Sequence, residues 1–171
     1  MGMRSVLIAA LASALAACGP AVQISSPVNT RGAPLPTQVT CDPTDQDRYV
    51  YRPGRLQVVA ACIRVTGTVV SSTAEADGDV HINVRLDAGD EGVLTAANVE
   101  EHGYLIVEPV CQFPPLQAEA IRVCASDGDP LGGGLPAAGA HVFMEGRYAL
   151  DLQHHGWAEL HPLYRWGAVP P

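Results

Sequence analysis

The sequence predicts a mainly β domain with one or two short helices, and three observations support this expectation. Five segments are rich in the β-branched and aromatic residues that favour strands. One of them, residues 80–87, alternates apolar and polar side chains as a half-buried strand does. The 17 Gly and 14 Pro make turns frequent and argue against long helices. With 47% hydrophobic and 16% charged residues, the chain of 171 residues is also too apolar for a disordered protein.

The predicted strands are separated by turn signals. They cover residues 57–71, 80–87, 104–110, 141–150 and 157–166. Asp77-Gly78 is a hairpin turn signal between the first two, and Gly67 interrupts the first strand where a long strand must bend. Residues 94–101 and 116–123 are the segments that we expect to form short helical turns.

This order is a long bent strand, a hairpin, a third strand, an excursion with a short helix, and a final hairpin. It resembles the OB-fold, a five-stranded Greek-key barrel, over residues 56–166. A β-sandwich is the alternative, although sandwiches usually have about seven strands. We therefore expect an OB-like barrel domain over residues 41–167, followed by a tail at 168–171.

The N-terminal segment, residues 1–17, has the pattern of a signal peptide. Arg4 precedes a short apolar run that is well below the roughly 20 residues needed to span a bilayer. The run ends in Leu15-Ala16-Ala17-Cys18, which resembles the lipobox of bacterial lipoprotein precursors. The resemblance implies that the chain is cut before Cys18 and that Cys18 is lipidated. An ordinary secretory signal, with Cys18 left as a free thiol, is the alternative.

Lipidation of Cys18 would place the protein outside the cytoplasm, anchored to a membrane through its lipid. Gly19 stands where an Asp commonly signals inner-membrane retention in Gram-negative lipoproteins, so the resemblance implies the outer membrane in such a host. Residues 18–40 contain four Pro among small polar residues, and we expect them to form a flexible tether.

Outside the cytoplasm, an even number of cysteines predicts disulfides. Four remain after Cys18, and they allow three pairings. We favour Cys111–Cys124, which closes a short loop, together with Cys41–Cys62. Four reduced thiols are the alternative, and a zinc site is disfavoured because no Cys-x-x-Cys spacing occurs.

Composition and missing motifs narrow the function classes. The chain has 18 acidic residues against 10 Arg and no Lys, which argues against a phosphate-backbone binder and hence against a nucleic-acid partner. No Ser or Thr lies in a nucleophile-elbow motif. We therefore expect a non-enzymatic module without a resident cofactor. It would either bind a glycan or a small ligand, or act as an envelope scaffold through contact with an envelope protein.

Two sets of residues are candidates for a site. His81, Asn83 and Arg85 share the polar face of the predicted strand 80–87, and we expect them to bind a ligand together with Trp157. The other set, in the last predicted hairpin, consists of Asp151, His155, Glu159 and His161.

Glu159 and His161 would lie about 7 Å apart on one face of a strand. Imidazole nitrogen with carboxylate oxygen suits Zn²⁺, so a metal-binding or metal-dependent hydrolytic protein is the alternative function. A purely structural hairpin, in which these side chains cap the turn and pair with Arg147 or Arg165, is a second reading. The surrounding stretch 146–162 is similar to the end of a group of uncharacterised exported bacterial proteins, a resemblance that implies no activity.

The acidic stretch Glu75-Ala76-Asp77-Gly78-Asp79 is a further candidate for a cation, since carboxylates suit Ca²⁺. Its Asp-Gly-Asp turn resembles that of staphylococcal nuclease-like domains, which are OB-folds. Val80 stands where that family has Thr, and the downstream Asp-x-Pro-Glu is absent, so nuclease activity is not expected. A turn whose Asp side chains cap their own backbone is the alternative.

Overall fold

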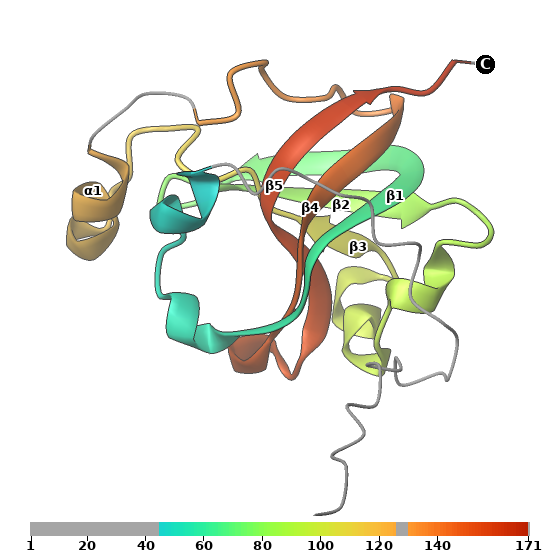
Figure 1. Ribbon diagram of the computed structural model, residues 1–171, viewed down its shortest axis with the longest axis horizontal. Helices are drawn as coiled ribbons and strands as arrows, with labels where there is room; N and C mark the ends of the chain where they lie inside the picture. The colour runs from blue at the N-terminus through green and yellow to red at the C-terminus, as the bar shows by residue number, and fades with distance from the viewer. Residues whose placement is uncertain (1–44, 126–129, 171) are drawn as a thin grey trace, which may run out of the picture.

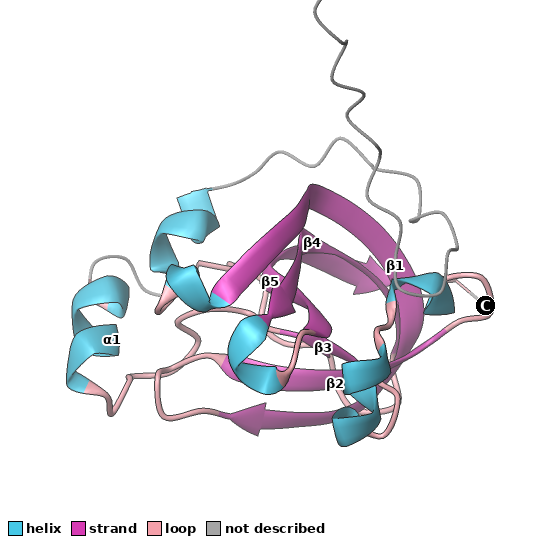
Figure 2. Ribbon diagram, turned by 90° about the horizontal axis from the view of Figure 1, so that it is seen from below, coloured by secondary structure: helices cyan, strands magenta, loops and turns pink. Residues whose placement is uncertain are grey.

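The structure, a computed structural model, describes residues 45–125 and 130–170. Its five strands are β1 (Leu56–Ala74), β2 (Val80–Leu86), β3 (Leu105–Val107), β4 (His141–Asp151) and β5 (Trp157–Ala168). They form one sheet that closes on itself in the order β1-β2-β3-β5-β4 (Figures 1 and 2). The β3–β5 pair is parallel, and the other pairs are antiparallel. The prediction of a mainly β domain is confirmed.

β1 is long enough to pair with β4 along its first part and with β2 along its second part. The change of partner occurs at Gly67, which lies opposite both Val142 of β4 and Leu86 of β2. A Cβ atom at Gly67 would lie 2.5 Å from the carbonyl oxygen of Arg85, so a glycine is needed for this close approach of two backbones. The predicted interruption of the first strand is therefore the point where β1 passes from pairing with β4 to pairing with β2.

Apolar side chains fill the inside of the ring. The alternation predicted for residues 80–87 is confirmed, because Ile82, Val84 and Leu86 of β2 are buried in the core. His81 and Asn83 lie on the opposite face of the strand and are half-buried, since other segments cover them. This covered outer face of β2 forms one wall of the site described below.

β3 is shorter than the strand predicted over residues 104–110. It ends at Val107 because Pro109 has no N–H to donate to a ladder. The N–H of Glu108 donates instead to the carbonyl of Leu160 in β5, while the carbonyl of Pro109 accepts from Val80. The chain leaves the sheet here, and Glu108 is held beside both β5 and β2.

Most helical segments are short 3-10 helices. They are η1 (Asp45–Tyr49), η2 (Pro53–Arg55), η3 (Glu91–Val93), η4 (Ala96–Glu101) and η5 (Leu152–His154). η4 lies in the segment predicted to be helical, and a capping box between Thr95 and Asn98 starts it. The α-helix α1 (Ala118–Cys124) lies in the second such segment and stands to one side of the strands (Figure 1).

The predicted Cys111–Cys124 disulfide is present and ties α1 to the segment after β3. Cys62 is also disulfide-bonded, and its predicted partner, Cys41, lies outside the described residues. Cys18, the predicted signal peptide and the predicted tether lie outside them too. β5 continues to Ala168, one residue into the predicted tail. In the described part of the chain, no helix is long and apolar enough to cross a membrane.

Candidate functional site

A pocket of about 460 Å³ opens on the outer face of β2. Most of its lining comes from β2, the β1–β2 connection, the β4–β5 connection, and η2 with the residues before it. The end of β1, η4, β5 and the segments after β3 and before α1 add one residue each. His81 and Asn83 come from β2, Glu75 from the first connection, and His154 from the second, next to Trp157 of β5. The ring closure thus gathers residues as far apart in the sequence as Tyr51 and Trp157.

His81 is surrounded by three carboxylates in this pocket. Its Nδ1 atom lies 3.8 Å from Glu75 Oε1 and 3.6 Å from Glu108 Oε1. Its Nε2 atom lies 3.5 Å from Glu101 Oε2. Burial alone would lower the pKa of His81, but the contact with Glu108 and the three negative charges raise it to about 9.

A second histidine lies beneath the pocket floor. His161 is fully buried, and its Nδ1 atom lies 2.5 Å from Glu108 Oε2 and 3.2 Å from Glu159 Oε1. Burial opposes the imidazolium form, yet Glu108 and Glu159 raise the pKa of His161 to about 10. Burial likewise works against ionised Glu108, but His161, His81 and Arg55 bring its pKa well below the usual range. Glu108 is therefore the charged group that joins the two histidines.

Arg55 is the cation that faces the carboxylates of this floor. It forms an ion pair with Asp151, and its guanidinium lies 3.5 Å from Glu108 and 3.7 Å from Glu159. Only 10% of its side chain is exposed, and the Asp151 and Glu159 side chains are fully buried. Burial and the charge of Glu108 raise the pKa of Glu159. Arg55 thus compensates buried negative charge from three different segments.

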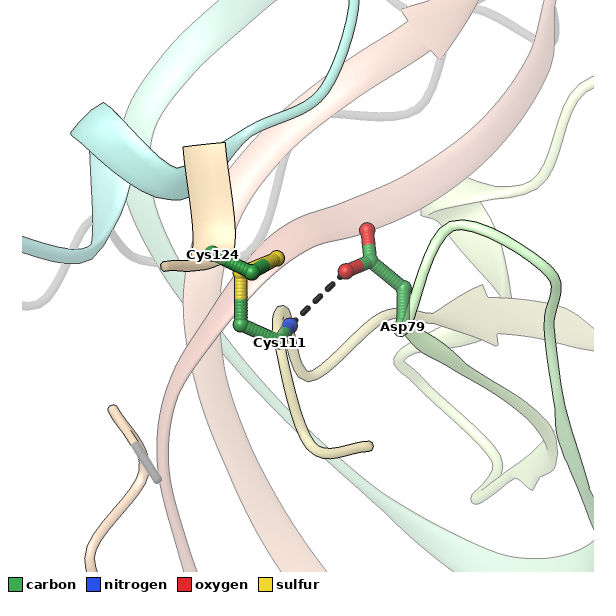
Figure 3. A group of neighbouring side chains, drawn as sticks. All are labelled: Asp79, Cys111 and Cys124. Atoms are coloured by element: carbon green, nitrogen blue, oxygen red, sulfur yellow. Dashed lines mark hydrogen bonds between the residues drawn. A yellow bond between two sulfur atoms is a disulfide. The ribbon is translucent and has the colours of Figure 1, made fainter. Parts of the chain in front are cut away.

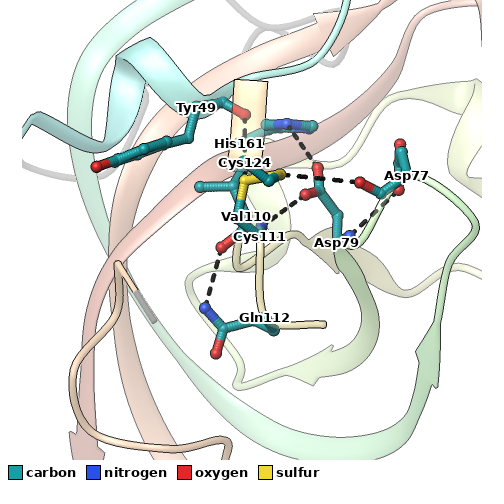
Figure 4. Close-up of a disulfide and its surroundings, with 8 residues drawn as sticks. All are labelled: Tyr49, Asp77, Asp79, Val110, Cys111, Gln112, Cys124 and His161. Carbon is teal, nitrogen blue, oxygen red and sulfur yellow. Dashed lines mark hydrogen bonds and ion pairs between the residues drawn. A yellow bond between two sulfur atoms is a disulfide. The ribbon is translucent and has the colours of Figure 1, made fainter. Parts of the chain in front are cut away.

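Asp79 extends this network toward the disulfide. Its Oδ1 accepts a hydrogen bond of 2.8 Å from the N–H of Cys111, next to the Cys111–Cys124 bond (Figure 3). Its Oδ2 faces His161 Nε2 at 3.7 Å (Figure 4). Among the described residues, neither of these two buried atoms has a hydrogen-bond partner. Burial raises the pKa of Asp79 to about 7.

The neighbouring Asp77 has a local role. Its Oδ1 accepts a hydrogen bond from the N–H of Asp79, so the acidic turn does cap its own backbone. This is the structural alternative that the sequence left open for this stretch. The same turn also directs Glu75 into the pocket and Asp79 under it.

Trp157 forms the aromatic wall of the pocket. Its Nε1 atom donates a hydrogen bond of 2.8 Å to Glu159 Oε2, which fixes the indole above the buried network. The ring of His154 stacks on it with centroids 4.1 Å apart, and His81 meets it edge-on at 5.8 Å. Because Trp157 is only 7% exposed, a ligand would reach its edge, or its face if His154 moved aside.

Three of the four predicted ligand-binding residues line the pocket: His81, Asn83 and Trp157. Arg85 does not, and its placement in the site was wrong. It lies two residues beyond Asn83 on the same face, opposite Thr68, where β1 has already begun to turn at Gly67. Its side chain is exposed.

The predicted metal set is assembled only in part. Asp151, Glu159 and His161 belong to one buried network, but His155 is 78% exposed and pairs with Glu100 instead. His155 follows η5 in the left-handed conformation, with φ of 57°, so it leaves the network at the hairpin turn. The structure therefore does not bring the four residues to one point.

The structural reading of the hairpin is also only partly right. Asp151 caps η5 by accepting from the N–H of Gln153, but its ionic partner is Arg55. Arg147 donates to the carbonyl of His161, and Arg165 pairs with Glu145.

Sequence reasoning missed Arg55, Glu101 and Glu108. Each lies in a different segment, and only the closure of the ring brings them together. The sequence contains one signal for Glu108. This residue directly follows the apolar run Leu105–Val107, where a buried side chain is expected, and a buried glutamate normally has a charged partner.

Among the described residues, three groups of three have ligand atoms close enough to hold a metal ion, and two of them belong to the pocket and its floor. They are Glu75, His81 and Glu108 in the pocket, and Asp79, Glu108 and His161 below it, with all ligand atoms within 4.8 Å of one another. A third group of this kind contains Cys111 and Cys124, whose sulfur atoms are bonded to each other. Comparison with known proteins gives no match to a family model, to a curated protein or to a solved structure.

Proposed function

We propose that this protein is a lipid-anchored extracytoplasmic module that binds a small polar ligand in the pocket beside His81 and Trp157, without catalysing a reaction. The observation that carries this proposal is the convergence of hydrogen-bonding groups and aromatic rings, including those of Tyr51 and Trp157, on one open pocket. The buried charges beneath the pocket add support, because strongly shifted pKa values cluster at functional sites.

The position of the pocket supports an OB-like Greek-key topology as part of the same proposal. The strand order β1-β2-β3-β5-β4 is that of a five-stranded closed ring. OB-folds bind oligosaccharides and oligonucleotides on the face of strands 2 and 3, between the β1–β2 and β4–β5 connections. The pocket lies at this place, since Glu75, His81 and His154 come from those elements.

The charge of the pocket narrows the ligand class. Four carboxylates line it, from Glu75, Asp77, Glu101 and Glu108, against two arginines and His81, whose raised pKa favours its charged form. One of the arginines, Arg52, is already paired with Glu119 at 3.2 Å. A nucleotide or another polyanion would be repelled. Neutral sugars and amino sugars fit the amide, carboxylate and indole groups, and we propose a glycan of this kind as the ligand.

The proposed location rests on the lipobox-like segment that ends at Cys18. With a net charge of −8, the chain gains no electrostatic attraction to an anionic membrane, so the lipid would provide the anchorage. A tether of residues 18–40 would let the pocket reach glycans of the envelope. Gly19 favours the outer membrane if the host is Gram-negative.

Calorimetric titration of the full chain tests the ligand proposal. The probes are three matched sugar oligomers: a neutral, an amino and an acidic one. We expect binding of the neutral or amino oligomer and none of the acidic one. Asn83→Ala should weaken binding, because its side chain lines the pocket.

Arg85→Ala is the matched control, because Arg85 lies on the same face of the same strand but outside the pocket. It should leave the affinity unchanged. Binding of the acidic oligomer alone, or equal effects of the two substitutions, would overturn the proposed pocket and ligand class.

A further inference from the structure

The side chains of Glu75, His81 and Glu108 converge on one point in the wall of the pocket. We propose that they bind a divalent transition metal ion of the Zn²⁺ class, with the open positions of the ion facing the pocket. This inference rests on the proposed function, because it uses the same pocket. It adds that a sugar oxygen would be held there by coordination to the ion. It replaces the four-residue metal set predicted from the last hairpin.

The distances fit a shared ion better than direct hydrogen bonds. His81 Nδ1 lies 3.8 Å and 3.6 Å from the facing oxygens of Glu75 and Glu108, beyond the usual hydrogen-bond range. Around an ion with bonds of about 2.0–2.2 Å, ligand atoms are roughly 3–4 Å apart. His81 therefore already has the spacing of a coordination shell to each glutamate, and the three ligand atoms all lie within 4.8 Å of one another.

The surroundings of His81 and Glu108 match those of metal ligands. A ligating histidine almost always donates its other N–H to a carboxylate or carbonyl group. Here His81 Nε2 faces Glu101 Oε2 at 3.5 Å, which would leave Nδ1 for the metal once the ion displaces the proton there. Glu108 is steadied in the same way, because His161 Nδ1 lies 2.5 Å from its far oxygen.

The burial of Glu108 is a separate observation that points to a cation. Only 3% of this residue is exposed. Its Oε2 atom faces His161 at 2.5 Å and Arg55 at 3.5 Å, away from the pocket, while Oε1 is directed toward His81 in the pocket. A buried carboxylate is costly unless its charge is compensated, and a bound ion at Oε1 would compensate the oxygen that faces the pocket.

The site is of the open kind. Three protein ligands leave at least one position of a Zn²⁺ ion for water or for a ligand oxygen. Glu75 is 39% exposed and the pocket is open to solvent, so an ion has an entry path. The lower group around Asp79 and His161 has no such access, because its members are all buried.

Zinc titration of the full chain, freed of metal by a chelator, tests this inference. We expect one equivalent of Zn²⁺ to bind, and Glu75→Gln or His81→Ala to abolish that binding. Glu75→Gln is the more telling variant, because an exposed side chain can change without unfolding the protein. Glu101→Gln should keep the site but lower its affinity by about 10-fold to 100-fold.

The exposed pair His155 and Glu100 provides matched controls. Its two atoms lie 2.9 Å apart outside the pocket, so His155→Ala and Glu100→Gln should leave zinc affinity unchanged. A wild-type chain that binds no zinc at micromolar concentration would refute the inference, and so would stoichiometric zinc that survives both Glu75→Gln and His81→Ala.

The sugar titration, repeated on the metal-free chain, separates this inference from the proposed function. Sugar binding that needs zinc supports both. Sugar binding by a chain that takes up no zinc keeps the pocket function and refutes only the metal. Zinc binding without any sugar binding supports the metal site and overturns the glycan proposal.

Discussion

The buried charges beneath the pocket give the sharpest prediction, which concerns Arg55. Replacing it with methionine keeps most of the side-chain length but leaves the buried carboxylates of Asp151, Glu108 and Glu159 without their shared cation. Removing one partner of a buried ion pair typically costs about 3–5 kcal/mol. Because three carboxylates lose compensation at once, we expect Arg55→Met to lower the free energy of unfolding by about that amount.

The control is Arg52→Met, three residues earlier. Arg52 also pairs with a glutamate, at 3.2 Å, but its side chain is 56% exposed and that of Glu119 is 58% exposed. Exposed pairs contribute about 0–1 kcal/mol, so this substitution should change stability little. Urea unfolding with the disulfides intact gives the free energy for each variant.

A double-mutant cycle identifies the cause of the loss. Arg55→Met combined with Asp151→Asn should cost less than the sum of the two single substitutions, by about 1–3 kcal/mol. The reasoning would be refuted if Arg55→Met behaved like Arg52→Met, or if the two substitutions at the floor were additive.

Three further predictions concern the fold. Burial raises the pKa of Tyr148 to about 12, from the ordinary value of 10.0 that holds in the unfolded chain. Between pH 10 and pH 12 the folded state therefore keeps a phenol proton that the unfolded state has lost, so the free energy of unfolding falls as the pH rises through this range. Tyr148→Phe should remove about 1.4 kcal/mol of the loss seen by urea unfolding at about pH 11, and an unchanged pH profile would contradict this. Gly67→Ala should lower the free energy of unfolding by about 1–3 kcal/mol, because the added Cβ would lie 2.5 Å from a backbone oxygen. Gly54→Ala is the control and should be neutral, because no atom lies within 4 Å of its added Cβ. Equal effects of the two substitutions on the urea midpoint would argue against the turn at Gly67. Replacing Cys111 and Cys124 together by Ala should cost about 3 kcal/mol, since their bond closes a loop with a sequence separation of 13, and an unchanged melting temperature would contradict it.

The strands could be predicted because their signals are local. Alternation along residues 80–87, and β-branched runs bounded by Gly or Pro, identify a strand without knowledge of its partners. The strand predicted over residues 104–110 extends beyond the end of β3, because Val110 is apolar like a strand residue whereas Pro109 cannot donate to the ladder. The Cys111–Cys124 pairing was predictable for a similar reason, since the two residues are close in sequence.

The candidate site was predictable only where one strand carries it. His81 and Asn83 alternate on β2, and Glu159 and His161 alternate on β5, so each pair was found. Glu108 was not found, because it gains its role from histidines on two different strands. His155 was wrongly grouped with its neighbours, since one left-handed residue in a tight turn reverses the direction of a side chain.

The two tryptophans provide the most direct test of ligand binding in the His81 pocket. Trp157 lines that pocket, whereas Trp166 lines a separate one of about 450 Å³ and donates to the carbonyl of Gly134. Each indole N–H gives its own signal in a ¹⁵N–¹H correlation spectrum, which can be followed while an amino-sugar oligomer is added to the zinc-loaded chain. Binding at His81 predicts that the Trp157 signal shifts and saturates while the Trp166 signal stays in place. A shift of Trp166 alone, or no shift of Trp157 at saturating sugar, would contradict it.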